Sequence, residues 1–182
     1  MKAYLKDVPM IRNIIGDGFY VYPIKGDGAC GLRAVAAWLF SDQSEGPYLG
    51  RNVNNKFVTN WEYWKSFFVF PFKRNVGIGK QKTFENESQL FNFFLNSADG
   101  AYMWRDNADF AAISNIYQVR IKIITVTHTE DNNPSVINIE PDPDFLAMSE
   151  MVPWKISDMI LLHTKDTHFD LIVPNKMKIL KL

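Results

Sequence analysis

The hydrophobic pattern of this chain changes from helical to strand-like spacing near residue 118. Before that point, long segments carry apolar residues at three- and four-residue intervals, as on the buried face of a helix. After it, the apolar runs are short, and several are rich in β-branched residues, as in half-buried strands. Helices followed by strands are typical of the α+β class. The last two runs are separated by the turn-like Thr164-Lys165-Asp166, so we predict that they pair as a hairpin.

The same pattern places the individual elements. Helices are expected at Cys30–Phe40, at Asn52–Phe72 with an end before Pro71, at Thr83–Asn96 and at Asp106–Tyr117. Strands are expected at Gly18–Ile24, Val119–Thr127, Val136–Ile139, Met159–His163 and His168–Val173. The segments Ser41–Gly50, Arg74–Lys82 and Glu130–Asp144 are expected to be mainly loops within a single domain spanning 1–182.

Composition excludes several classes of function. The 182 residues carry 20 basic and 20 acidic side chains, so no overall field would attract nucleic acid or an anionic membrane. The sequence shows neither a run of about 18 apolar residues nor a secretory leader. Its one cysteine cannot form an internal disulfide or a zinc site built on several thiolates. We therefore expect a cytoplasmic protein, and we take it to be a monomer.

The lone thiol lies in an unusual setting. Cys30 follows Asp27-Gly28-Ala29 at the predicted start of a helix. A helix N-terminus carries partial positive charge and unpaired backbone N–H groups, which lower a thiol pKa and can stabilise an oxyanion. A single cysteine in a globular domain is otherwise most often a small buried hydrophobic residue. The turn before Cys30 favours the chemical interpretation.

A thiol that attacks an amide also needs a base, and the candidates are His128, His163 and His168. His168 opens a predicted strand, whose period of two places Asp170 on the same face as His168. Asp170 would then orient the imidazole. His163 is the competing base, although no acidic residue stands two positions after it. His128 is followed by polar and acidic residues, as in a solvated loop, and we assign it no role.

The order of these motifs resembles the ovarian-tumour (OTU) family of cysteine proteases. The resemblance lies in Asp-Gly-x-Cys-x-x-Arg from Asp27 to Arg33 and in His-aromatic-Asp from His168 to Asp170. Trp104-Arg105-Asp106, leading through a helix to the strand at Val119, is similar to the middle of the family's domain. The likeness covers about residues 19–174 and implies a papain-like fold, with a small, mostly antiparallel central sheet flanked by helices.

The resemblance also implies an activity and site residues. Members of the family remove ubiquitin or ubiquitin-like modifiers from lysine side chains, which makes ubiquitin the expected partner. By this likeness Cys30 is the nucleophile, His168 the general base and acid, and Asp170 the third member of the triad. Asp27 shapes the oxyanion loop, with Arg33 in support. No metal or cofactor is implied.

Further expectations rest on residue type alone. Trp104 and Phe169 are aromatic residues near the catalytic segments, and they are expected to line the channel for the glycine tail of ubiquitin. The ubiquitin-facing surface is expected in the region 52–82. Many relatives have two bulky apolar residues after the cysteine, whereas this chain has Gly31 and Leu32. A glycine at this position loosens the start of the helix.

Two alternatives to a deubiquitinase stay open at this stage. One is a catalytically silent OTU-like module that binds ubiquitin, against which the intact triad argues. The other is a protease that processes a viral or mobile-element polyprotein, because the same residues would serve. A viral, mobile-element or endosymbiont source is a hypothesis, and for a viral protein it would imply the host cytoplasm.

Overall fold

Strand pairing in the computed structural model joins residues 19–22 to residues 171–174 within one sheet. The structure describes residues 8–77, 80–96, 107–126, 134–144, 157–164 and 168–174. The sheet consists of β1 (Phe19–Tyr22), β4 (Val119–Val126), β5 (Ser135–Ile139), β6 (Ser157–Thr164) and β7 (His168–Pro174), in the order β1-β7-β6-β4-β5. Among the strands of the described residues, only β4 and β6 pair in parallel, so the predicted α+β class with a mostly antiparallel sheet is confirmed.

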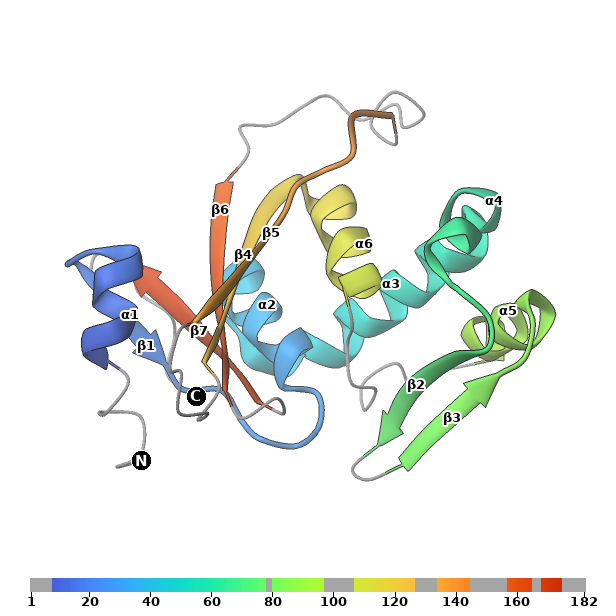
Figure 1. Ribbon diagram of the computed structural model, residues 1–182, viewed down its shortest axis with the longest axis horizontal. Helices are drawn as coiled ribbons and strands as arrows, with labels where there is room; N and C mark the ends of the chain where they lie inside the picture. Colours follow the sequence, from blue (N-terminus) through green and yellow to red (C-terminus); the bar gives the residue numbers. More distant parts are fainter. Residues whose placement is uncertain are drawn as a thin grey trace.

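Helices cover both faces of this sheet. Helix α1 (Val8–Ile15) lies on one face, where its Ile11 packs in a small apolar cluster with Ile124, Val126, Leu162 and Ile172. Helices α2 (Cys30–Phe40) and α6 (Asn107–Tyr117) lie on the other face (Figure 1). The larger core cluster joins α2 to Leu161 and Leu171 on this second face. Because side chains alternate along β6 and β7, the two faces of these strands contribute to two separate hydrophobic clusters.

Helix α2 is the most buried helix near the sheet. It packs against β7, α3 (Gly46–Thr59) and the short 3-10 turn η2 (Gln43–Glu45). Its alanines at positions 34, 36 and 37 are fully buried, and small side chains allow this close approach on several sides. The start of α2 is thus held by the sheet, by a neighbouring helix and by a turn.

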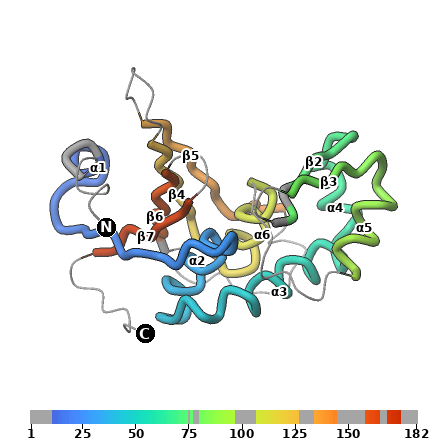
Figure 2. The backbone as a smooth tube through the Cα atoms, turned by 90° about the horizontal axis from the view of Figure 1, so that it is seen from below, coloured from blue at the N-terminus to red at the C-terminus, as the bar shows by residue number. Residues whose placement is uncertain are grey.

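A second part of the molecule, rich in aromatic residues, lies at the opposite end from α1 (Figure 2). It contains α4 (Trp61–Trp64), the 3-10 turn η3 (Lys65–Phe67), the hairpin β2 (Phe72–Gly77) and β3 (Lys80–Phe84), and α5 (Glu87–Asn96). Phe57, Trp64, Phe68 and Phe94 pack around one another with ring centroids 4.7 to 5.9 Å apart. None of the helices in the described ranges is long and apolar enough to cross a membrane.

The helix predicted over Asn52–Phe72 is wrong in its bounds. Helix α3 begins at Gly46 with Pro47 in its first turn, inside the segment predicted as a loop, and it ends at Thr59. Asn60 leaves the helical region, with φ −122° and ψ 39°, and only short helical turns follow. The aromatic spacing from Trp61 onward reflects burial in the aromatic cluster, which the pattern alone could not separate from a continuous helix.

The loop predicted at Arg74–Lys82 instead falls largely within the β2–β3 hairpin. The sequence of β3 lacks the apolar alternation that predicts a strand, because the strand is charged and almost entirely exposed, with only Phe84 buried. Thr83 belongs to that strand, so it is not the start of the helix predicted from Thr83. The helix begins later, at Glu87.

Asn86 caps α5. Its Oδ1 accepts the Gln89 N–H at 3.1 Å, and Gln89 Oε1 in turn accepts the Glu85 N–H at 2.9 Å. Asn86 thereby satisfies a donor that the first turn of α5 leaves unpaired, and Gln89 binds the segment before the helix. We expect Asn86→Ala to lower the free energy of unfolding by about 1 kcal/mol in urea denaturation. Asn86→Asp keeps the acceptor and should stay near the parent. Equal losses in both variants would argue against the cap.

Candidate active site

Cys30 is the first residue of α2, and a tight turn presents it. Gly28 has φ +82°, a conformation that residues with a Cβ rarely adopt, and it turns the chain into the helix. Ala29 occupies the N-cap position without a capping side chain. No side chain therefore caps the first N–H groups of α2, and a helix N-terminus of this kind favours negative charge, such as that of an oxyanion.

His168 and Asp170 lie at the start of β7 and contact each other. His168 Nε2 is 3.0 Å from Asp170 Oδ1, as the shared face of the strand predicts. The same oxygen accepts the Ile24 N–H at 2.8 Å, which fixes the carboxylate from the segment after β1. Asp170 is 1% exposed, so its interaction with the imidazole is little screened by water.

The imidazole and the thiol form the second contact of the site. The hydrogen bond to Asp170, and then the hydrogen bond to the Cys30 sulfur, raise the pKa of His168 to about 10. The Phe169 N–H also donates to Cys30 Sγ at 3.4 Å. With Nε2 engaged by Asp170, Nδ1 is the ring nitrogen that remains for the thiol. These contacts place the thiol, the imidazole and the carboxylate in one hydrogen-bonded row.

Asp27 and Arg33 hold the loop before Cys30. Arg33 Nε lies 3.0 Å from both Asp27 oxygens, and Nη2 lies 2.7 Å from Oδ2. Asp27 Oδ1 also accepts the Ala29 N–H at 3.2 Å. Partial burial alone would raise the pKa of Asp27, but the bonds from Arg33 and Ala29 outweigh it and hold the pKa below its ordinary value. The carboxylate therefore stays ionised and keeps the loop in shape.

The competing base, His163, lies on the opposite face of the hairpin from His168. It pairs across the strands with Phe169, and the two rings stack with centroids 4.3 Å apart. His163 Nδ1 lies 3.4 Å from Thr125 Oγ1. The structure thus brings together Cys30, His168 and Asp170, and it leaves His163 behind Phe169.

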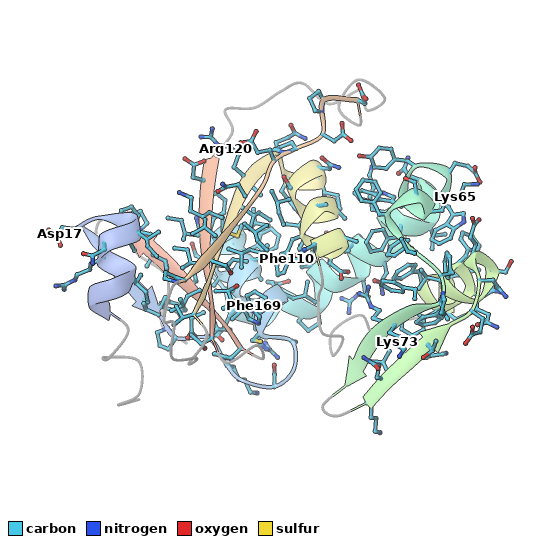
Figure 3. The ribbon with its side chains drawn as sticks, in the orientation of Figure 1. Asp17, Lys65, Lys73, Phe110, Arg120 and Phe169 are labelled. Atoms are coloured by element: carbon cyan, nitrogen blue, oxygen red, sulfur yellow. The ribbon has the colours of Figure 1, made fainter. Side chains whose placement is uncertain are left out.

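Phe169 packs in the core, and its expected place in a channel wall stays a prediction. Its side chain is only 8% exposed, and its ring packs 5.3 Å from that of Phe110 (Figure 3). Strand alternation explains this position, because residues beside His168 and Asp170 must face the other way, toward α2. Trp104, the other expected wall residue, lies outside the described residues.

Gly31 lies where a larger residue would be crowded. A Cβ at this position would come within 3.3 Å of Phe110 and 3.4 Å of Phe169. The absence of a side chain at Gly31, where many relatives have a bulky residue, leaves room for the two aromatic rings packed over the helix start. Its small size allows Phe169 to approach α2, and the Phe169 N–H thereby reaches the sulfur.

Sequence reasoning missed two neighbours of the site. Gln43 contacts both Lys25 and Arg33, and Gly26 lies beside the ring of His168. Gln43 lies in a segment predicted as a loop, and no pattern of residue types distinguishes it from other polar loop residues. Among the described residues, no group of three or more His, Cys, Asp or Glu side chains is placed to hold a metal ion.

A buried thiol at a helix start, with a histidine and an aspartate from a neighbouring strand, defines a papain-like arrangement of side chains. No protein-family model and no curated protein sequence matches the chain. Solved structures do match it. The OTU domain of OTUD1 has a TM-score of 0.65 at 18% identity, covering 93% of this chain and 96% of that domain.

Two further matches come from a bacterium and a virus. An OTU deubiquitinase of Wolbachia pipientis wMel, bound to ubiquitin, has a TM-score of 0.58 at 16% identity, covering 89% of this chain and 99% of that one. The Hazara virus OTU bound to ubiquitin has a TM-score of 0.51 at 15% identity, covering 88% and 84%. The protein therefore has the OTU-domain fold, as the sequence resemblance implied.

Proposed function

We propose that the protein is a cysteine-dependent deubiquitinase that hydrolyses the isopeptide bond after the C-terminal glycine of ubiquitin or a ubiquitin-like modifier. The observation that carries this proposal is the position of Cys30 at the start of α2, bonded to His168, which Asp170 holds in turn. Support from the fold is coarser, since the structural neighbours are OTU domains and two of those described above hold ubiquitin.

The acylation step follows from the three side chains. The Cys30 thiolate attacks the carbonyl carbon of the terminal glycine and forms a tetrahedral oxyanion. Backbone N–H groups of the loop and of Cys30 stabilise that oxygen. The His168 imidazolium then gives its proton to the departing lysine amine, the C–N bond breaks, and a thioester remains on Cys30.

Deacylation uses the imidazole in the opposite sense. Neutral His168 removes a proton from a water molecule, and the resulting hydroxide attacks the thioester carbonyl. The C–S bond breaks and the thiolate leaves, with the proton retained on His168. Asp170 holds the ring in place through both steps, because its Oδ1 is itself fixed by the Ile24 N–H.

The test is covalent capture by ubiquitin with an electrophilic C-terminus. We expect one adduct on Cys30, detected by intact mass, and no adduct with Cys30→Ala. His168→Ala should strongly slow the labelling, whereas His163→Ala is the matched control on the paired strand and should label at a rate close to that of the parent.

Each alternative gives a different result. A silent ubiquitin-binding module would bind ubiquitin without forming the adduct. A polyprotein-processing protease would cleave a peptide bond of its precursor and leave the ubiquitin probe unlabelled. Either outcome would overturn the proposed function.

A further inference from the structure

Gln43 braces the loop before the nucleophile at two points. Its side-chain Oε1 accepts the Lys25 N–H at 3.0 Å, at the beginning of the loop. Its backbone carbonyl accepts Arg33 Nη1 at 3.0 Å, and Arg33 in turn holds Asp27 in the middle of the loop. One residue of the η2 turn is therefore connected to both supports of the loop.

The turn that carries Gln43 is itself well defined. The Asp42 side chain accepts the Ser44 N–H at 2.8 Å and caps the turn. The Gly46 N–H bonds to the Gln43 carbonyl and leads directly into α3. Gly46 also packs closely on Arg33, since a Cβ there would lie 3.1 Å from Arg33 Cγ. Gln43 therefore belongs to a turn that is held by hydrogen bonds and by packing against Arg33.

The braced loop reaches the imidazole. A Cβ built on Gly26 would lie 3.7 Å from both Cε1 and Nδ1 of His168, which places the Gly26 backbone along that edge of the ring. Nδ1 is the nitrogen that remains for Cys30, because Nε2 is bonded to Asp170. A shift of Lys25 would therefore move the chain segment that flanks the reacting edge of the base.

From these contacts we propose that Gln43 is a positioning residue of this site. Its side-chain amide fixes the Lys25 end of the loop, so that Gly26 confines His168 beside Cys30 and the loop N–H groups face the developing oxyanion. The inference rests on the proposed cysteine chemistry. The two bonds of Gln43 can be separated, because its backbone carbonyl survives any substitution and only the bond to Lys25 depends on the side chain.

The kinetic test uses hydrolysis of a fluorogenic amide at the C-terminus of ubiquitin. Gln43→Ala should lower kcat by about five- to tenfold, the worth of one hydrogen bond, with KM changed less than about twofold. Gln43→Glu retains an acceptor for the Lys25 N–H and should restore most of the rate. Glu45→Ala is the control in the same turn, and we expect it to behave as the parent. An unchanged kcat in Gln43→Ala, or an equal loss in Glu45→Ala, would overturn the proposal.

A second measurement does not depend on ubiquitin. Because the chain has a single cysteine, alkylation by iodoacetamide reports on Cys30 alone. We expect Gln43→Ala to raise the pH midpoint of alkylation, since a less confined imidazolium stabilises the thiolate less, with the melting temperature nearly unchanged. Coincident profiles for parent and variant would refute the role of Gln43. If the parent alkylates normally but hydrolyses no ubiquitin substrate, the proposed function fails, and the alkylation profiles still decide on Gln43.

Discussion

Replacing Asp109 with alanine should lower the free energy of unfolding by about 3–5 kcal/mol. Arg74 Nη2 of β2 lies 2.8 and 2.9 Å from the two Asp109 oxygens on α6, and the side chains are 1% and 0% exposed. The substitution removes the carboxylate that neutralises a buried guanidinium. A loss of this size would lower the melting temperature by roughly 6–20 °C for a chain of this length.

The control is an ion pair of the same chemistry on the surface. Arg120 Nε and Asp158 Oδ1 are 2.6 Å apart, but both side chains are largely exposed. Asp158→Ala should leave the melting temperature close to that of the parent, because water and salt screen such pairs. Calorimetry of both variants separates the effect of burying an ion pair on stability from the effect of charge pairing alone. Similar losses of melting temperature in Asp109→Ala and Asp158→Ala would show that burial does not increase the contribution of the ion pair to stability.

A third variant separates the ion pair from its surroundings. Arg74→Met combined with Asp109→Ala removes both charges and leaves an apolar contact beside Phe94, over whose ring the Arg74 guanidinium now lies at 5.4 Å. Apolar replacement of a whole buried pair is often neutral. The double variant should therefore regain much of the stability that Asp109→Ala loses.

Two parts of the candidate site could be predicted from local sequence, whereas the pairing of Cys30 with the distant His168 was implied by the family resemblance. The turn before Cys30 and the helix after it adjoin one another, and two-residue periodicity alone places His168 and Asp170 on one face. The same periodicity, applied fully, would also have placed Phe169 in the core.

The parts that could not be predicted depend on contacts distant in sequence. Arg74 has the residue type of a solvent-exposed loop residue, and its burial goes with contacts to Asp109, 35 positions away, and to Phe94. The β2–β3 hairpin was missed for a different reason: its two strands are adjacent in sequence, but the exposed β3 carries no apolar alternation. Gln43 supports the site through the way the η2 turn packs beside α2, and no local motif encodes that packing.

Asp170→Ala should reduce kcat/KM for ubiquitin conjugates by about 10²–10⁴-fold. The variant loses the bond that orients His168 and the one that receives the Ile24 N–H, so both the base and the chain beside it lose an anchor. Asp170→Asn is a milder change, since the amide oxygen can accept both bonds while the negative charge is gone. Steady-state hydrolysis should therefore rank the parent first, Asp170→Asn second and Asp170→Ala last.

The asparagine variant also predicts a pH effect with a definite sign. Asp170 is the leading cause of the raised pKa of His168, so removal of its charge lowers that pKa. The imidazolium needed to protonate the departing amine is then lost at a lower pH. The alkaline limb of kcat/KM should therefore move down by about 1–3 pH units. An alkaline limb that stays in place in Asp170→Asn would show that the carboxylate orients the ring without holding its charge.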